Sequence, residues 1–389
     1  MIHFTNSARL RRSALQAGFV GVIALVIASA IFTARQNLVE QGLTSGFGFL
    51  SRATGWDISF SLLSFQPNDT YARALLIGLT NTLFLTALTL PLATVIGVIV
   101  ALLRTSGLAV LEKIGTVYVE LFRNVPILLQ LLFWYSLLRG LPQPRDATGL
   151  WDMVYLTGRG LYTPALSVAP LNVSATACLV FVAIGIAVAM RLNRHFRALP
   201  HGTRLACMAL LWLTSLCAAA LILWAGRDLD QPFVALPEAK GLGIRGGARI
   251  SPELAAMILA IAIYGGAYIA EIMRAGFNSV PKGQYEAGKA LGISSFRIFT
   301  RIRFPLALRA VLPTLANQYI WLTKASTLGI AVGFADYFMV VSTAINQSGQ
   351  TLELIGLLAA GFLAVNYTLG WVMNRTNDAI KLRGTQWRG

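Results

Sequence analysis

Long apolar runs, separated by short polar segments, make up most of the chain. A helix needs about 20 apolar residues to cross the hydrocarbon core of a membrane. The stretches that approach or exceed this length are roughly 14–34, 72–103, 114–138, 168–190, 205–225, 250–273, 306–331 and 353–374. The second is overlong and contains Pro91, which predicts a tilted or kinked helix. The pattern therefore predicts an all-α fold, a polytopic transmembrane helical bundle with about eight spanning helices.

The composition agrees with a membrane protein. Hydrophobic residues make up 56% of the 389 residues, charged residues only 12%, and the mean hydropathy is +0.65. Soluble domains contain about 25% charged residues, so this chain has half the usual number of solvating side chains. Its net charge of +16 could indicate nucleic-acid binding. The basic residues, however, are spread over the segments between apolar runs, as membrane topology alone requires, and we reject the nucleic-acid reading.

The distribution of lysine and arginine predicts the orientation. Arg9, Arg11 and Arg12 precede an apolar run that is too long for a signal peptide, so we expect an uncleaved first helix. With the N-terminus inside, the inner segments hold twenty basic residues and few acidic ones, whereas the outer segments hold ten, nearly balanced by acidic residues. Since inner loops carry the excess of basic residues, both termini and the loop 274–305 are predicted to be cytoplasmic.

Residues 283–305, GQYEAGKALGISSFRIFTRIRFP, form a polar and basic segment between two apolar runs. Its core, EAGKALG, predicts one short amphipathic helix ended by Gly292. The stretch from Gly283 to Ala290 nearly matches the nucleotide-binding motif GxxxxGK[ST]. Ala290, however, has no hydroxyl for Mg²⁺, and no β-strand precedes the motif. The sequence therefore predicts no nucleotide site in this chain.

The same segment resembles the EAA loop in membrane subunits of bacterial ATP-binding-cassette importers. In the polar amino acid uptake group the pattern is close to AExxRGGxxx[IV]PxGQxEAAxxLG. The matching residues here are Ala270, Glu271, Arg274, Gly276, Val280, Pro281, Gly283, Gln284, Glu286, Ala287, Leu291 and Gly292. Gly288 replaces the second alanine of the motif, and Phe304-Pro305 replaces Leu-Pro. The resemblance implies that Gly283, Gln284, Glu286, Ala287, Gly288, Leu291 and Gly292 couple the chain to an ATPase subunit.

Two further motifs extend the resemblance. Residues 121–130 are similar to FRGTPxLxQ, and residues 317–328 to NQxxxxxKx[ST]SL. The similarity covers about 72–138 and 250–380, and is greatest to the long permeases of broad-specificity L-amino-acid systems. It implies a type I ABC importer permease fold. The expected regions are an N-terminal helix and periplasmic loop (1–71), two core parts (72–139 and 250–380), an insertion with two extra spans (140–249) and a cytoplasmic tail (381–389).

The resemblance also implies a function and partners. The chain is expected to be the inner-membrane permease of an importer that carries L-amino acids, and not itself an enzyme. The implied partners are a cytoplasmic ATP-binding subunit dimer, a second permease subunit of the same or a related sequence, and a periplasmic solute-binding protein. ATP and Mg²⁺ are expected on the ATPase, so no cofactor is assigned to this chain.

Ionisable residues inside spanning helices are costly and therefore candidates for function. Arg123 lies ten residues after Lys113, about 15 Å along a helix and near mid-bilayer. Pro126 disturbs the same helix and frees a backbone carbonyl. Either Arg123 pairs with Glu271 or Glu120 to hold helices together, or Arg123 and Glu271 line a cavity for a zwitterion. The candidate substrate-binding residues are Arg123, Asn124, Pro126, Glu271 and Lys324.

Two other function classes remain as alternatives at this point. An ion- or proton-coupled secondary transporter of small polar solutes needs acidic residues at mid-depth, for which Glu120, Glu271 and Asp336 are available. A membrane-embedded enzyme has little support, because no His cluster or pair of carboxylates has a useful spacing. Cys178, Cys207 and Cys217 lie in apolar runs and predict small buried hydrophobic side chains, with no metal site.

Overall fold

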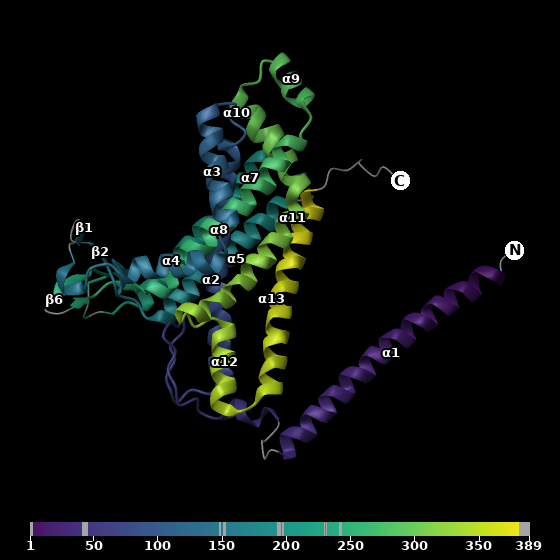
Figure 1. Cartoon of the computed structure of the whole chain (residues 1–389). Helices are drawn as coiled ribbons and strands as arrows, with labels where there is room; N and C mark the ends of the chain where they lie inside the picture. Colours follow the sequence, from purple (N-terminus) through teal and green to yellow (C-terminus); the bar gives the residue numbers. More distant parts are fainter. Residues whose placement is uncertain are drawn as a thin grey trace.

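The computed structural model describes residues 3–40, 46–147, 149–150, 153–192, 196, 198–228, 230, 232–240 and 243–380; the predicted tail 381–389 lies outside these residues. The described part is a helical bundle, which confirms the all-α prediction (Figure 1). Within the described residues, five helices are long and apolar enough to cross a membrane, or up to seven spans are present if each of two bent pairs counts as one.

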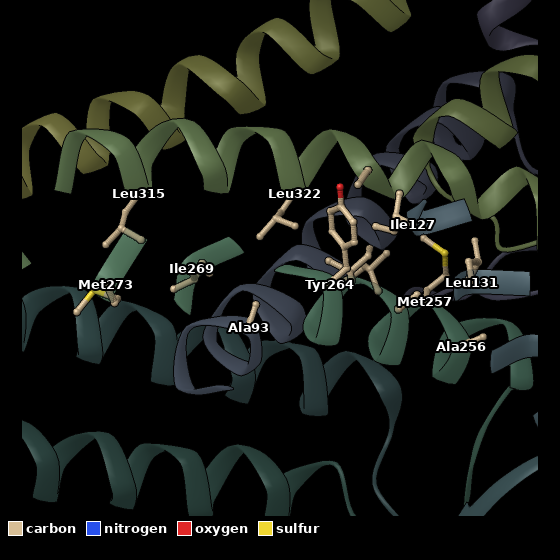
Figure 2. Packing of buried hydrophobic residues seen from close by; sticks show 14 of the residues in the cluster. Ala93, Ile127, Leu131, Ala256, Met257, Tyr264, Ile269, Met273, Leu315 and Leu322 are labelled. Carbon is tan, nitrogen blue, oxygen red and sulfur yellow. The ribbon is translucent and has the colours of Figure 1, made fainter. Parts of the chain in front are cut away.

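The centre of the bundle is α8 (Pro252–Ser279), which packs against α2 (Tyr71–Leu103), α4 (Ile127–Arg139) and α11 (Phe304–Lys324). Ser251 caps α8 by accepting a hydrogen bond from the Leu254 N–H, and Pro252 occupies the first helical position. Figure 2 shows side chains of α8 and its neighbours interdigitating in the core. Gly97 on α2 lets the two backbones approach closely, because a Cβ there would lie 2.6 Å from the Ile269 Cβ.

The predicted span 114–138 is not one continuous helix. It is broken into α3 (Ala109–Asn124) and α4, which meet at an angle of 100°. Pro126 causes the break: it has no N–H to donate, and it forces Val125 into an extended conformation. The side-chain amide of Gln130 then donates to the carbonyls of Phe122 and Val125, each at 2.9 Å. These two bonds satisfy backbone carbonyls that have no helical hydrogen-bond partner at the break.

A second break was not predicted. The span expected over 306–331 comprises α11 and most of a 3₁₀ segment (Ala325–Val332). It is followed by α12 (Tyr337–Ser348), which is bent by 50° from the preceding helical stretch. Gly333 adopts a left-handed conformation (φ 79°), which turns the chain. Asp336 caps α12, since its carboxylate accepts hydrogen bonds from the Met339 N–H (2.9 Å) and the Ser326 hydroxyl (3.1 Å). The sequence analysis missed α12 altogether.

The segment 46–70, predicted only as a loop, packs against α2 and α12. It contains a short 3₁₀ helix (Phe47–Ser51), and Phe49 and Ile58 are buried in a second core with residues of α12 and α13 (Thr351–Ile380). The Asn81 amide donates at 2.8 Å to both the Phe60 and Ala335 carbonyls, which joins this segment to the entrance of α12.

The predicted insertion contains a helical hairpin and small β-sheets that the all-α prediction did not include. The hairpin is α5 (Pro170–Leu192) and α7 (His201–Ala225), which pack on each other, and the Asn172 amide donates to the Ile222 carbonyl at 2.8 Å. The strands are β1 (Gly149–Leu150), β2 (Val154–Thr157), β3 (Gly160–Thr163), β4 (Ala165–Leu166), β5 (Val234–Ala235), β6 (Glu238–Lys240), β7 (Gly243–Arg245) and β8 (Ala248–Ile250), with a short 3₁₀ turn at Pro144–Asp146.

All strand pairs are antiparallel: β1-β2-β3-β8 form one sheet, and β4-β5 and β6-β7 form two more. These strands connect α4 to α5 and α7 to α8, so they lie at the end of α8 opposite α9. Figure 1 shows the labelled strands gathered beside α4, while α9 (Lys282–Ala290) and α10 (Ser295–Ile298) project at the far end of the bundle. The helix α1 (His3–Glu40) extends away from the bundle.

Candidate functional site

A polar cavity of about 390 Å³ lies where α3 ends beside α2 and α8. It is lined by Arg104, Val119, Glu120, Arg123, Asn124, Tyr268 and Glu271. Arg123 and Asn124 reach it because they occupy the last turn of α3, directly before the break at Pro126. Pro126 occupies the N-cap position of α4 and does not line the cavity. Pro126 therefore affects the cavity indirectly: it ends α3 next to Arg123 and Asn124, but its own side chain does not line the cavity.

Glu271 is the centre of a charged network in this cavity. Its Oε2 accepts a hydrogen bond from Arg104 at the C-terminal end of α2, and its Oε1 accepts one from Arg274, one turn further along α8. The Arg123 Nη1 lies 4.0 Å from the same Oε2, without a hydrogen bond. Three guanidinium groups therefore share one carboxylate, and the network has an excess of positive charge.

Arg123 is the least satisfied of the three arginines. Its side chain is 38% exposed, against 14% for Arg104 and 32% for Arg274. The guanidinium lies over the ring of Tyr268, 4.9 Å from the ring centroid, which holds it beside the cavity through a cation–π contact. An anion that enters the cavity therefore meets a positioned guanidinium that Glu271 does not fully neutralise.

An aromatic group supports this contact from α8 and α11. The Tyr264 hydroxyl donates to the Tyr268 hydroxyl at 3.1 Å, and the Trp321 ring stacks on Tyr264 with centroids 5.5 Å apart. Tyr264 and Tyr268 are four residues apart and so lie on the same face of α8. The arrangement fixes the ring on which Arg123 rests.

The cavity lies towards the C-terminal end of α8. Glu271 is eight residues before Ser279, about 12 Å along the axis, so this carboxylate lies in the C-terminal half of the helix. Lys324 is exposed at the end of α11 and is absent from the lining of this cavity. The structure therefore brings together Arg123, Asn124 and Glu271 of the predicted set, and leaves Pro126 and Lys324 apart.

The predicted short helix ended by Gly292 is confirmed as α9. Gly292 has a left-handed conformation (φ 69°), and the N–H groups of Gly292 and Ile293 donate to the carbonyls of Lys289 (2.9 Å) and Gly288 (3.0 Å). This pair of bonds is the Schellman ending of a helix. Glu286 was expected in the first turn, but α9 begins at Lys282, so Glu286 lies in the second turn, further from the positive end of the helix dipole.

Gly288 is the one buried residue of α9. A Cβ on Gly288 would lie 2.9 Å from the Ile298 side chain, so the glycine lets α9 and α10 pack closely. Beyond this contact, Leu291 (77% exposed) and Phe296 (75% exposed) extend apolar side chains from a polar segment. A second cavity, of about 510 Å³, lies beside α9 and is lined by residues from the segments 277–286 and 298–303.

Three residues of the cavity and its charged network were not among the predicted substrate-binding residues or their possible ion-pair partners: Arg104, Tyr268 and Arg274. Glu120 was named only as a possible partner of Arg123 and as an available acidic residue. The i, i+3 spacing of Glu271 and Arg274 could have indicated their ion pair. Arg104 follows an apolar run, and nothing in its local sequence indicates that it faces α8. Among the described residues no group of His, Cys, Asp or Glu could hold a metal ion.

Comparisons with known proteins identify relatives of this chain. The family model described as "Binding-protein-dependent transport system inner membrane component" matches residues 93–378. The putative amino-acid ABC transporter permease YhdX of Escherichia coli K12 is 37% identical over 89% of this chain and 88% of its own length. The general L-amino acid transport permease AapQ of Rhizobium johnstonii is 36% identical over 89% and 86%.

A third relative is the glutamate/glutamine/aspartate/asparagine transport permease BztB of Rhodobacter capsulatus, 31% identical over 89% of this chain and 88% of its own length. These matches include most of the chain, insertion and core alike, and they do not favour the secondary-transporter alternative. The chain belongs to the family of binding-protein-dependent transport system inner membrane components.

Proposed function

We propose that this chain carries L-amino acids across the inner membrane, driven by ATP hydrolysis on a separate subunit. The observation that carries the proposal is the Arg123 guanidinium, which faces the 390 Å³ cavity and makes no hydrogen bond to Glu271. Every L-amino acid has an α-carboxylate, and arginine binds a carboxylate through two parallel hydrogen bonds. The substrates named for AapQ and BztB are amino acids, which supports this class.

In this proposal Arg123 binds the α-carboxylate, and Glu271 keeps the guanidinium oriented until substrate arrives. Asn124 lies beside Arg123 on the cavity wall and offers a further amide donor or acceptor. Because Glu271 is also held by Arg104 and Arg274, it stays in place when Arg123 turns to the substrate. The cavity is then ready for the next substrate once the carboxylate leaves.

Uptake by Arg123→Ala and Arg123→Lys variants tests the carboxylate role. A charge-assisted hydrogen bond contributes about 1.5–3 kcal/mol, so Arg123→Ala is expected to lower uptake by roughly ten-fold or more. Arg123→Lys should also impair uptake, because an ammonium group cannot form the bidentate pair. The loss should be similar for every amino acid tested. Near-normal uptake in both variants contradicts the role, and failure to retain the ATPase in a pull-down favours a purely structural ion pair.

The proposed partners are a dimer of cytoplasmic ATP-binding subunits, a second permease of the same or a related sequence, and a periplasmic solute-binding protein. We place both termini and α9 in the cytoplasm. The contact with the ATPase is assigned to residues 284–296, in which Leu291 and Phe296 provide exposed apolar side chains on a polar segment. Such exposed groups are typical of an interface.

Substitution of Gly292 tests this contact. A tryptophan at a φ of 69° is strained, so Gly292→Trp should distort the end of α9 and uncouple or release the ATPase while the chain still inserts. Unchanged ATP-driven uptake by this variant would show that the docking assignment is wrong. We further expect no ATPase activity from the purified chain alone; vanadate-sensitive hydrolysis by it, free of contaminants, contradicts the placement of ATP and Mg²⁺ on the partner.

A further inference from the structure

A zwitterionic substrate needs a carboxylate of the protein as well as a guanidinium. Two carboxylates line the cavity with Arg123: Glu271 and Glu120. Both oxygens of Glu271 accept hydrogen bonds, from Arg104 and from Arg274. An ammonium group would have to displace one of these arginines to bind Glu271. The network therefore leaves Glu271 poorly suited to the second charge of the substrate.

Glu120 is in the opposite situation. It is exposed on α3 and lines the cavity, and within the part of the chain that the structure describes it makes neither an ion pair nor a hydrogen bond. A carboxylate in a spanning segment is costly unless it has a partner or a role in the transport pathway. Arg123 follows Glu120 by three residues, so their side chains lie on the same face of the helix.

We propose that Glu120 binds the α-ammonium group of the substrate, while Arg123 binds its α-carboxylate; this inference rests on the proposed function. One face of α3 then binds the two charged groups that all amino acids share, which are attached to the same carbon atom. The rest of the cavity contacts the side chain of the substrate. The two carboxylates then have different roles. Glu271, which accepts hydrogen bonds from two arginines, positions Arg123, whereas Glu120, which makes no such bond within the described residues, contacts the substrate.

The test uses the complex of this chain with its permease and ATPase partners, purified in lipid nanodiscs without the binding protein. The probes are radiolabelled L-glutamine and glutaramate, which is glutamine without the α-ammonium group. The wild-type complex is expected to bind glutamine at least about ten-fold more tightly, since one charge-assisted contact distinguishes the two probes. Glu120→Gln should reduce this preference to within about two-fold, and Glu120→Asp should restore part of it.

Glu112→Gln is the matched control. It changes the same residue type on the same helix, but Glu112 accepts a hydrogen bond from the Gly107 N–H at the start of α3 and does not line the cavity. Its preference for glutamine should equal that of the wild type. If Glu120→Gln prefers glutamine over glutaramate as strongly as the wild type does, the assignment is overturned. It is also overturned if Glu120→Gln weakens the binding of both probes equally, because that result indicates a structural role such as a contact between permeases.

The outcomes separate this inference from the proposed function. If Arg123→Lys weakens both probes while Glu120→Gln keeps the preference, only the Glu120 assignment is wrong. If the wild-type complex binds neither L-glutamine nor, in a second measurement, L-glutamate or L-histidine, the cavity is not an amino-acid site and both proposals are wrong.

Discussion

Helices α8 and α7 are both long enough and apolar enough to cross a membrane, yet they have opposite environments. In the most apolar stretch of α8, 67% of the residues are buried inside the protein, whereas in α7 the share is 6%. The more apolar of the two, α7, is the peripheral one. Lipid is as apolar as leucine, so an apolar surface gains nothing by leaving it, and α7 exposes Leu213, Leu216 and Trp224 outside the bundle.

The central helix is instead the one with small and polar residues. Gly265 and Gly266 allow α2 and α11 to pack closely, while Glu271 and Arg274 find charged partners on neighbouring helices and within α8. Polar groups in a membrane gain most when they face the protein interior, because the alternative is hydrocarbon. The comparison shows that hydropathy identifies the spans, while small and ionisable residues identify the centre. Matched substitutions in the two regions test this conclusion.

The largest effect is expected from Glu271→Ala. It leaves three arginines without their shared carboxylate, and removing one partner of a buried pair costs about 3–5 kcal/mol, here reduced to roughly half because Glu271 is partly exposed. The complex should unfold at a lower temperature and lose uptake. Glu238→Ala, which breaks an exposed pair with Lys240 in the β6–β7 sheet, is the control and should leave both unchanged. Wild-type stability in Glu271→Ala contradicts the central role of the network.

A smaller but clear effect is expected from Gly97→Val. The new Cβ would lie 2.6 Å from the Ile269 Cβ and 3.1 Å from the Ala270 nitrogen, so α2 and α8 must separate. Overpacking of this kind typically costs about 1–3 kcal/mol. Gly185→Val on α5 has no atom within 4 Å of the new Cβ and should be tolerated. Equal thermal stability of the two variants in detergent would show that the α2–α8 contact is not tight.

Tyr268→Leu should have an intermediate effect on transport with little change in stability. It removes the ring beneath Arg123, and a cation–π contact contributes about 0.5–2 kcal/mol, so uptake should fall by roughly two- to thirty-fold. Tyr268→Phe keeps the ring and should retain most of the uptake. Trp212→Leu on α7, where the ring is 45% exposed, is the matched aromatic change and should have no effect. Equal uptake in the leucine variants would mean that the ring does not position Arg123.

The smallest effect is expected at Gly288, on the helix that follows α8. Alanine favours a helix by about 1 kcal/mol over glycine, but its Cβ would contact Ile298 at 2.9 Å, so Gly288→Ala should be close to neutral. The double variant Gly288→Ala/Ile298→Val makes room for the methyl group and should bind the ATPase slightly more tightly in a titration. A strong loss of binding in the single variant would show that Ile298 cannot move.

Much of the fold was predictable from the chain because its signals are local. Apolar length gave the spans, and the short helix ended by Gly292 followed from a glycine after an amphipathic run. Pro126 indicated a disturbed helix, but the 100° angle depends on how α4 packs against α8. The helix α12 was missed because it is short and follows the turn at Gly333, and the strands of the insertion were missed because each spans only two to four residues.

The sequence by itself determined that this protein is a helical membrane bundle with a basic segment between two apolar runs, since these follow from hydropathy and charge along the chain. Only the tertiary structure decided what each ionisable residue does. Arg104 and Glu271 are 167 residues apart, and no local pattern brings them together. The packing of α2, α3 and α8 does so, and the same packing satisfies Glu271 and leaves Glu120 open. Long-range contacts, not residue type, therefore distinguish the two carboxylates.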